Sequence, residues 1–167
     1  MEIKDRVLVV EDDKRISNFI KTVLEANNYD VIVAQTGAEA YSMVTSQCPD
    51  VVILDLGLPD MDGMKILQGV REWSAMPVIV VSARTHERDK VEALDLGADD
   101  YITKPFDMEI LRSKINGLMK KRDDMKRYFS NSSAASHNEE NTLSTNPFMD
   151  AVVKNIEKHL DLSLIHL

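Results

Sequence analysis

The sequence predicts an α/β fold built on a doubly wound parallel sheet, and three observations point to it. Short apolar runs rich in β-branched residues alternate with amphipathic stretches five times within the first 128 residues. The first run, RVLVV, is apolar throughout after its arginine, which is typical of a strand covered by helices on both faces. The composition, 44% hydrophobic and 29% charged, lies near the average of globular proteins, so neither a wholly disordered chain nor a fibre fits.

The elements follow from the periodicity of the apolar residues. Strands are predicted where apolar runs are short and continuous, and helices where apolar residues recur every three or four positions. We expect strands at 6–10, 30–34, 50–55, 77–81 and 99–102. We expect helices at 13–27, 38–46, about 63–72, 86–96 and 107 to about 128. A loop rich in glycine, proline and aspartate, at 56–63, follows the third strand.

The chain changes character after this region. We predict a first domain at 1–122, a helix extension and flexible linker at 123–146, and a short amphipathic helix at 147–167. The linker is expected because residues 130–146 are polar almost throughout. The last helix is expected because Asn146 and Pro147 form a typical helix start, and one apolar stripe follows: Phe148, Val152, Val153, Ile156 and Leu160. One such helix cannot form a domain alone, and the sequence leaves open what this stripe packs against.

Charge and composition exclude several classes of function. Twenty basic and 28 acidic residues give a net charge of −8, which argues against a broad basic surface for nucleic acid. The single cysteine, Cys48, cannot form an internal disulfide. The sequence has no apolar run of the roughly 20 residues that a membrane helix needs, and its N-terminus does not resemble a signal peptide. We therefore expect a cytoplasmic protein with no membrane partner.

Polar residues follow the predicted strands at the edge where parallel sheets bind ligands. The first strand is followed by Glu11, Asp12 and Asp13, and the third ends at Asp55. Clustered carboxylates repel one another unless a cation is present, and such hard oxygen ligands suit Mg²⁺. Asp13 is either a further ligand or the N-cap of the following helix.

The chemistry of this edge favours phosphoryl transfer. An aspartate in such a cluster can act as a nucleophile towards a phosphoryl group. Ser82, at the end of the fourth strand, could donate a hydrogen bond to a phosphoryl oxygen, and Lys104, after the fifth, could neutralise its charge.

Four separated motifs carry a resemblance to a known family. In order along the chain they are VLVVEDD, DVVILDLGLPDMDG, PVIVVSA and LGADDYITKPF. Together they resemble the CheY-like receiver domain of two-component response regulators over roughly residues 5–122. The resemblance implies the flavodoxin-like strand order 2-1-3-4-5, with a C-terminal helical tail added here. The segments REWSAMPVIVVSAR and DKVEALDLGADDYITKPF are similar to the OmpR/PhoB group, and within it to regulators paired with potassium-pump (Kdp) sensor kinases.

The resemblance assigns a role to each matching residue. It makes Asp55 the phosphoacceptor and Lys104 the partner of the phosphate. It makes Glu11 and Asp12 the acidic pair, Asp12 the more direct Mg²⁺ ligand, with further metal oxygens from Asp55 and from the backbone carbonyl of Gly57. In addition, it makes Ser82 the switch hydroxyl and Tyr101 the switch aromatic, and it implies a cis Lys104–Pro105 peptide bond.

The function implied is that of a signalling switch. A sensor histidine kinase would supply the phosphoryl group, and the receiver would catalyse its own phosphorylation and dephosphorylation. In OmpR/PhoB relatives the modified domain forms a two-fold dimer through interchain ion pairs, and four residues stand where such pairs would form here: Lys90, Asp99, Asp100 and Lys114. Relatives more often have arginine in place of Lys114, and lysine lacks the bidentate geometry of arginine. The alternative is a receiver-fold interaction module that works without phosphate, through its tail helix.

The tail differs from that of OmpR/PhoB relatives, which continue into a winged-helix domain. From about residue 107 the chain resembles the segment that leads into AraC-type helix-turn-helix domains, on the strength of MKKRDDMKRYFSN and NTLSTNPFMDAVVKNIEKHL. We expect no complete DNA-binding element in this sequence. The tail is either a fused or truncated segment or a naturally divergent one.

Overall fold

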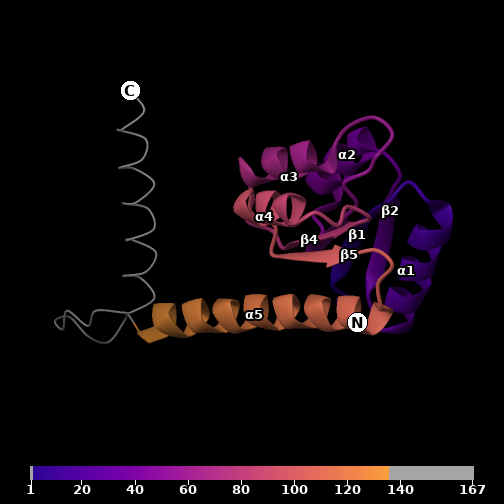
Figure 1. Ribbon diagram of the computed structural model, residues 1–167. Helices are drawn as coiled ribbons and strands as arrows, with labels where there is room; N and C mark the ends of the chain where they lie inside the picture. The colour runs from indigo at the N-terminus through magenta and orange to yellow at the C-terminus, as the bar shows by residue number, and fades with distance from the viewer. Residues whose placement is uncertain (1, 136–167) are drawn as a thin grey trace, which may run out of the picture. The chain divides into compact units, whose positions relative to one another are not determined.

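Five strands and five helices alternate along the part of the chain that the structure describes, residues 2–135 (Figure 1). The structure is a computed structural model. The strands are β1 (Arg6–Val10), β2 (Asp30–Ala34), β3 (Val51–Leu54), β4 (Val78–Ser82) and β5 (Asp100–Thr103). The helices are α1 (Lys14–Ala26), α2 (Gly37–Gln47), α3 (Gly63–Arg71), α4 (Glu87–Asp95) and α5 (Met108–Ala135). None of the helices among these residues is both long enough and apolar enough to cross a membrane.

The strands form one parallel sheet in the order β2-β1-β3-β4-β5. This order confirms the predicted doubly wound architecture, and it places β1 and β3 next to each other at the centre. Their register pairs Val10 with Leu54, the last residues of the two strands. The residues that follow, Glu11 and Asp55, therefore lie beside each other at the carboxyl edge of the sheet.

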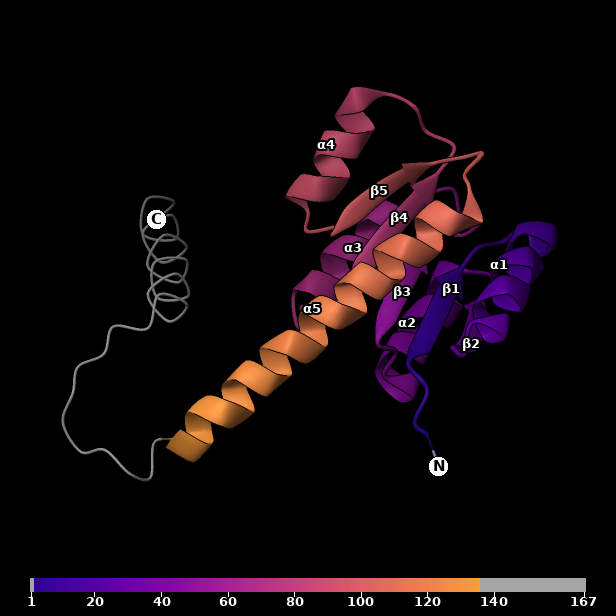
Figure 2. The ribbon, with the colours of Figure 1, turned by 90° about the horizontal axis from the view of Figure 1, so that it is seen from below.

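Helices cover both faces of the sheet (Figure 2). Alternate residues of β1 point to opposite faces: Val7 and Val9 pack with α1 and α5, whereas Leu8 and Val10 pack with α2, α3 and α4. Both sets are fully buried, so the sheet has an apolar core on each side. Burial on both faces explains why the strands read as continuous apolar runs in the sequence.

Arg122 anchors α5 at the amino-terminal edge of the sheet. Its guanidinium lies 2.8 Å from Asp5 and 2.8 Å from Asp50, and it also pairs with Asp123 in its own helix. Asp50 in turn accepts a hydrogen bond of 2.7 Å from the backbone N–H of Arg6, the first residue of β1. The clustered charges thus join α5 to the segments that lead into β1 and β3.

The helix α5 is longer than predicted. It continues to Ala135, so the prediction that the polar linker begins at residue 130 was wrong for its first residues. Serine hydroxyls in this last part of the helix donate to backbone carbonyls three residues earlier, from Ser130 to Arg127, from Ser132 to Phe129 and from Ser133 to Ser130. The polar side chains are therefore compatible with a helix. The rest of the predicted linker and the predicted helix at 147–167 lie outside the described residues.

Candidate functional site

Backbone hydrogen bonds hold the polar residues just beyond the strand ends. The N–H of Asp55 donates to Val10 at 2.9 Å, and the N–H of Lys104 donates to Ser82 at 2.8 Å. The N–H of Glu11 donates to Ala34, the last residue of β2, at 3.0 Å. The sheet ladder thus continues for one residue past its strands, and it fixes where the side chains of the site begin.

Three carboxylates meet at this edge. One oxygen each from Glu11, Asp12 and Asp55 lies within 4.8 Å of the others. Glu11 and Asp55 are only 3% and 6% exposed, whereas Asp12 is exposed to solvent. An all-oxygen donor set with an open side fits a divalent cation such as Mg²⁺, which keeps several of its waters.

A single ammonium serves the two buried carboxylates. The Nζ atom of Lys104 lies 2.6 Å from Glu11 and 3.4 Å from Asp55. Burial disfavours the charged ammonium, but the hydrogen bond to Glu11 and the charge of Asp55 outweigh this effect, so the pKa of Lys104 is raised. Lys104 therefore remains a cation at the site.

The negative charge at the site exceeds what one lysine can balance. Burial raises the pKa of Glu11 to about 7, and the nearby charge of Asp55 raises it further, while the hydrogen bond from Lys104 works in the opposite direction. Burial is the largest cause of this raised pKa, and the two buried carboxylates have one ammonium between them, so a second positive charge would favour their ionised forms. A divalent cation held by Glu11, Asp12 and Asp55 would supply that charge.

The loop between β3 and α3 is held close to Asp55. The N–H of Gly57 donates to the Asp55 carboxylate at 3.2 Å, and Gly57 forms an isolated bridge with Asp62 across the loop. At Gly63, an added Cβ atom would lie 2.5 Å from the backbone oxygen of Asp55, so only glycine allows this close approach. Asp60 holds the loop from the other side, since its carboxylate accepts from the N–H groups of Gly37 and Ala38 at 2.8 and 3.0 Å.

Ser82 and Tyr101 meet at the loop that follows β4. Ser82 is 1% exposed, and its hydroxyl oxygen accepts a hydrogen bond of 3.1 Å from the N–H of Arg84. Tyr101 is 7% exposed, and its hydroxyl donates to the backbone carbonyl of Arg84 at 2.9 Å.

The predicted cis peptide bond between Lys104 and Pro105 is confirmed.

Of the two roles predicted for Asp13, metal ligand or N-cap, the structure shows the N-cap. Asp13 is the N-cap of α1, with its carboxylate accepting from the N–H of Arg15 at 2.9 Å. Its own N–H donates to the Glu11 carboxylate at 3.2 Å, so it helps to orient the acidic pair. The sequence alone could not distinguish a cap from a ligand, because both follow a strand end.

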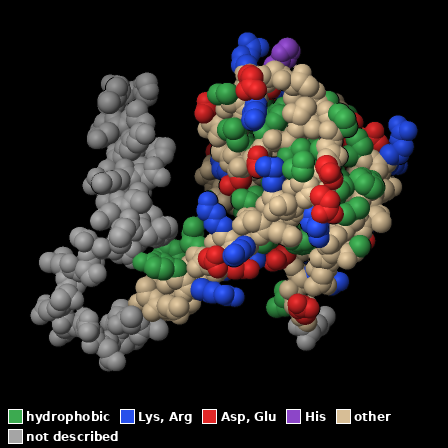
Figure 3. Space-filling view, turned by 60° about the horizontal axis from the view of Figure 1, so that its bottom comes forward, with side chains coloured by type: hydrophobic (Ala, Val, Ile, Leu, Met, Phe, Trp, Pro, Cys, Tyr) green, Lys and Arg blue, Asp and Glu red, His purple; other side chains and the backbone are tan. Residues whose placement is uncertain are grey.

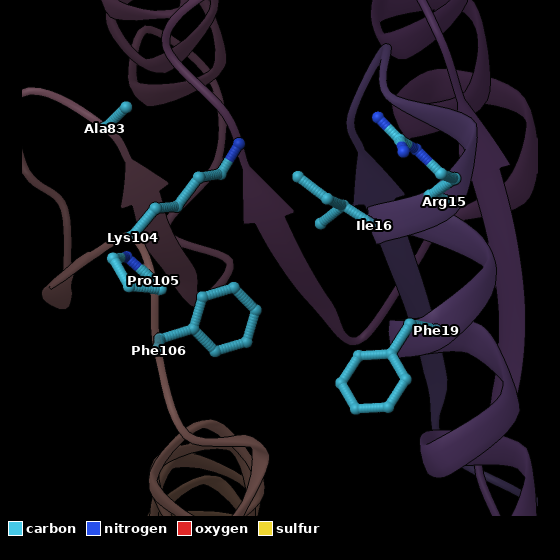
Figure 4. A pocket seen from close by; sticks show the side chains of 7 residues that line it. All are labelled: Arg15, Ile16, Phe19, Ala83, Lys104, Pro105 and Phe106. Carbon is cyan, nitrogen blue, oxygen red and sulfur yellow. The ribbon is translucent and has the colours of Figure 1, made fainter.

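A cavity of about 570 Å³ opens beside Lys104 (Figure 4). Its walls come from α1 and from the segments after β4 and β5: Arg15, Ile16, Phe19, Ala83, Lys104, Pro105 and Phe106. Phe19 is 56% exposed. Most of these lining residues were missed by sequence reasoning, in which Phe19 counted only as part of the apolar pattern of a helix. Phe19 and Ile20 are both apolar, but Ile20 is buried and Phe19 is not, and the helical spacing alone did not separate them because adjacent positions can share an apolar face, as Val23 and Leu24 do.

The four residues predicted to form interchain pairs lie on two different parts of the surface. Asp100 pairs with Lys114 within the chain, between β5 and α5, and Lys90 is exposed on α4. Asp99 instead pairs with Arg71 at 3.2 Å and accepts from the N–H of Val78 at 2.8 Å, at the start of β4. Asp99 lies in the bend just before β5, whereas Asp100 is the first residue of the strand, so the two side chains have different neighbours.

Apolar side chains accompany the first of these two groups. Val91 and Leu94 on α4 and Ile110 on α5 are 51%, 39% and 51% exposed. We call the surface formed by Lys90, Val91, Leu94, Asp100, Ile110 and Lys114 the α4–β5–α5 face. Figure 3, turned so that α5 comes forward, shows apolar side chains interspersed with charged ones on this side of the protein.

Comparison with known proteins agrees with this arrangement. Residues 7–116 match the response regulator receiver domain family, and the chain belongs to that family. It is 49% identical over 115 residues to the transcriptional regulatory protein KdpE of Mycobacterium tuberculosis, an alignment that covers 69% of this chain and 51% of that protein. It is 34% identical over 175 residues to KdpE of Staphylococcus aureus, covering 99% of this chain and 71% of that protein.

A solved structure shows the same fold. The receiver domain of the Francisella response regulator 1452 aligns with a TM-score of 0.69 at 39% identity, covering 71% of this chain and 99% of that one. The chain spans about half the length of the M. tuberculosis and Escherichia coli KdpE proteins that it matches. These relatives place the domain among the OmpR/PhoB-type response regulators, as the motifs predicted.

Proposed function

We propose that this domain accepts a phosphoryl group on Asp55 from a sensor histidine kinase, with Mg²⁺ as cofactor. The observation that carries the proposal is the grouping of a buried Asp55 with Glu11 and Asp12 on one side and with Lys104, 3.4 Å away, on the other. Two acids and one base around a buried carboxylate are costly for stability alone. They are the groups that transfer of a phosphoryl group to Asp55 requires.

Each residue has a distinct part in the proposed reaction. An Asp55 oxygen attacks phosphorus while the phosphorus–nitrogen bond of the phosphohistidine breaks, and the histidine nitrogen keeps the electron pair. Glu11, Asp12, Asp55 and the backbone carbonyl of Gly57 would hold Mg²⁺. The bound ion would offset the negative charge of the phosphoryl oxygens. Lys104 would exchange part of its contact with Glu11 for a phosphoryl oxygen, and the Ser82 hydroxyl would donate to another. Hydrolysis of the acyl phosphate would then return Asp55 to its free form.

The cavity beside Lys104 would offer the phosphodonor an apolar surface next to a residue that contacts Asp55. Phe19 on α1 and Phe106 after β5 form its apolar walls, and Arg15 lies at its rim (Figure 4). A helix that carries the donor histidine could pack its apolar side chains here and bring the phosphoryl group to Asp55. We therefore assign the contact with the kinase to this surface.

The signal would leave through the α4–β5–α5 face. Phosphorylation adds about 1.5 to 2 negative charges, which would draw Ser82 and Lys104 towards Asp55. Tyr101 packs in the core that α4 covers and is bonded through Arg84 to the same loop as Ser82, so its packing would change with theirs. We propose that the α4–β5–α5 face then forms a homodimer, and that a longer parent protein uses the dimer to control transcription.

Labelling with a small phosphodonor tests the proposal. Incubation with acetyl phosphate should phosphorylate the wild-type chain in the presence of Mg²⁺ and not with excess EDTA. The variant Asp55→Asn should not be labelled, whereas Asp124→Asn, which removes an exposed carboxylate of α5, should be labelled like wild type. Equal labelling of wild type and Asp55→Asn would refute the proposal. Absence of labelling in a folded wild-type chain would favour the alternative, a module that works without phosphate.

A further inference from the structure

Arg84 contacts three parts of the site that are separate in the sequence. It lies two residues after Ser82, in the loop between β4 and α4. Its N–H, its carbonyl and its guanidinium each make a different hydrogen bond or ion pair. No other residue among 2–135 joins Ser82, Tyr101 and the loop after Asp55 in this way.

The backbone N–H of Arg84 orients the Ser82 hydroxyl. The N–H donates to the hydroxyl oxygen at 3.1 Å. A serine hydroxyl that accepts one hydrogen bond still has its own proton to donate. The bond from Arg84 therefore leaves Ser82 able to donate to a phosphoryl oxygen on Asp55.

The backbone carbonyl of Arg84 holds Tyr101 in a buried position. The tyrosine hydroxyl donates to this carbonyl at 2.9 Å, and Tyr101 is only 7% exposed. Tyr101 is part of the core that packs against α3 and α4. The position of the Arg84 carbonyl therefore determines whether the buried tyrosine finds an acceptor.

The Arg84 side chain ties this loop to the loop after the phosphoacceptor. Its guanidinium lies 3.2 Å from a carboxylate oxygen of Asp62. The other oxygen of Asp62 accepts from the N–H of Met64 at 3.0 Å and caps α3, and Asp62 pairs with Gly57 across its loop. The ion pair thus joins the loop that carries Gly57 to the loop whose backbone is hydrogen-bonded to Ser82 and Tyr101.

We propose that Arg84 is a positioning residue, whose ion pair with Asp62 couples the loop after Asp55 to Ser82 and Tyr101. The inference rests on the proposed function. It adds a residue through which the loop after Asp55 influences the positions of Ser82 and Tyr101. In the unphosphorylated chain the ion pair favours the buried position of Tyr101. Its effect is moderate, because the side chains of Arg84 and Asp62 are 35% and 42% exposed.

Two substitutions separate the ion pair from the helix cap and the backbone. Asp62→Asn removes the charge but keeps an oxygen that can cap α3, and asparagine is as good an N-cap as aspartate. Arg84→Gln removes the guanidinium but keeps the N–H and the carbonyl. Glu25→Gln is the matched control, since it removes the ion pair of Lys21 and Glu25, which are 42% and 48% exposed on α1.

The readout is the environment of Tyr101 in the unphosphorylated full chain. With ¹³C-labelled tyrosine, NMR resolves the ring signals of four tyrosines, and Tyr101→Phe assigns the signal of interest. We expect Asp62→Asn and Arg84→Gln to raise the ratio of exposed to buried Tyr101 by about 1.5- to 5-fold, the size of effect of a half-exposed ion pair. The double variant should move the signal no further than either single variant. High salt should shift wild type but not the variants, and Glu25→Gln should match wild type.

The outcomes distinguish this inference from the proposed function. If the Tyr101 signals of Asp62→Asn and wild type coincide, or if the effects of the two single variants add, the coupling through Arg84 is wrong. Labelling of the same wild-type sample with acetyl phosphate tests Asp55 independently. A labelled chain with an unmoved Tyr101 would refute only the role of Arg84, whereas an unlabelled chain would refute the phosphoacceptor role.

Discussion

The ammonium of Lys104 lies 2.6 Å from a carboxylate oxygen of Glu11, although 93 positions separate the two residues in the sequence. The pair forms because β1 and β5 both end at the carboxyl edge of one parallel sheet. Asp55 also lies within reach of Lys104, so one ammonium serves two carboxylates, and the three residues carry one negative charge in excess when both carboxylates are ionised. The first prediction follows from this imbalance.

Replacement of Lys104 by methionine should destabilise the metal-free domain by about 3 kcal/mol, because it leaves two buried carboxylates without a cation. Labelling of Asp55 by acetyl phosphate should slow by about 100-fold, the typical cost of losing a group that stabilises a transition-state charge. Mg²⁺ should recover more of the stability of Lys104→Met than it adds to wild type. Urea unfolding with and without Mg²⁺ measures this difference, and an equal gain in both proteins would contradict it.

Leu94→Glu should prevent dimerisation without affecting phosphorylation. Leu94 is exposed on the α4–β5–α5 face, and a carboxylate there would be buried without a partner in a dimer. We expect the dissociation constant of the phosphorylated dimer to rise at least about tenfold, or about 1.4 kcal/mol. Sedimentation velocity of beryllofluoride-treated protein measures the change. Glu87→Gln, in the first turn of the same helix, is the control, and a Leu94→Glu variant that dimerises like wild type would exclude this face.

Asp60 should make the stability of the domain depend on pH in the acid range. Hydrogen bonds from Gly37 and Ala38 lower the pKa of Asp60 below its usual value. A carboxyl whose pKa is lowered in the folded state contributes stability above its unfolded pKa, near 4, and loses it as the pH falls through the lowered value. The difference in unfolding free energy between wild type and Asp60→Asn should therefore shrink below about pH 4. Chemical unfolding of both proteins across this range gives the answer, and a difference that grows on acidification would show the opposite sign.

Arg122→Gln should loosen α5 where Arg122, in the middle of the helix, anchors it to the sheet. The substitution removes charged hydrogen bonds to Asp5 and Asp50, and we expect a loss of about 2 kcal/mol in unfolding free energy. Amide hydrogen exchange should accelerate in α5 after Leu118 more than in α3, which does not contact this cluster. Uniform acceleration across the domain would instead indicate a general loss of stability.

The sheet could be predicted from the sequence almost residue by residue, because strands covered on both faces require unbroken apolar runs. β1 and β2 have the predicted bounds, and β4 begins one residue later than predicted, at Val78 instead of Pro77, since proline has no N–H for the ladder. The end of α5 was not predictable from polarity. Serines and asparagines after Phe129 suggested a linker, but serine hydroxyls can also bond to carbonyls within a helix.

In the candidate site, too, some residues could be predicted from the sequence and others could not. Residues directly after strands, such as Glu11, Asp55 and Lys104, are placed by the sheet, so their proximity followed from the strand pattern and the resemblance. Residues in loops are placed by contacts that the sequence does not reveal. The ion pair of Arg84 with Asp62 depends on the paths of two loops, and no periodicity indicates it.

The register that pairs Val10 with Leu54 has a consequence for how this domain tolerates change. Glu11 and Asp55 are neighbours only because each is the next residue after that pair. One residue inserted into β1 or β3 would turn one of these carboxylates to the opposite face of the sheet, even if every apolar contact could be rebuilt. An insertion at the exposed end of α5 would leave their spacing unchanged. Length is therefore constrained far more tightly in the two central strands than in the last helix, and libraries of insertions should survive in the helix and fail in the strands.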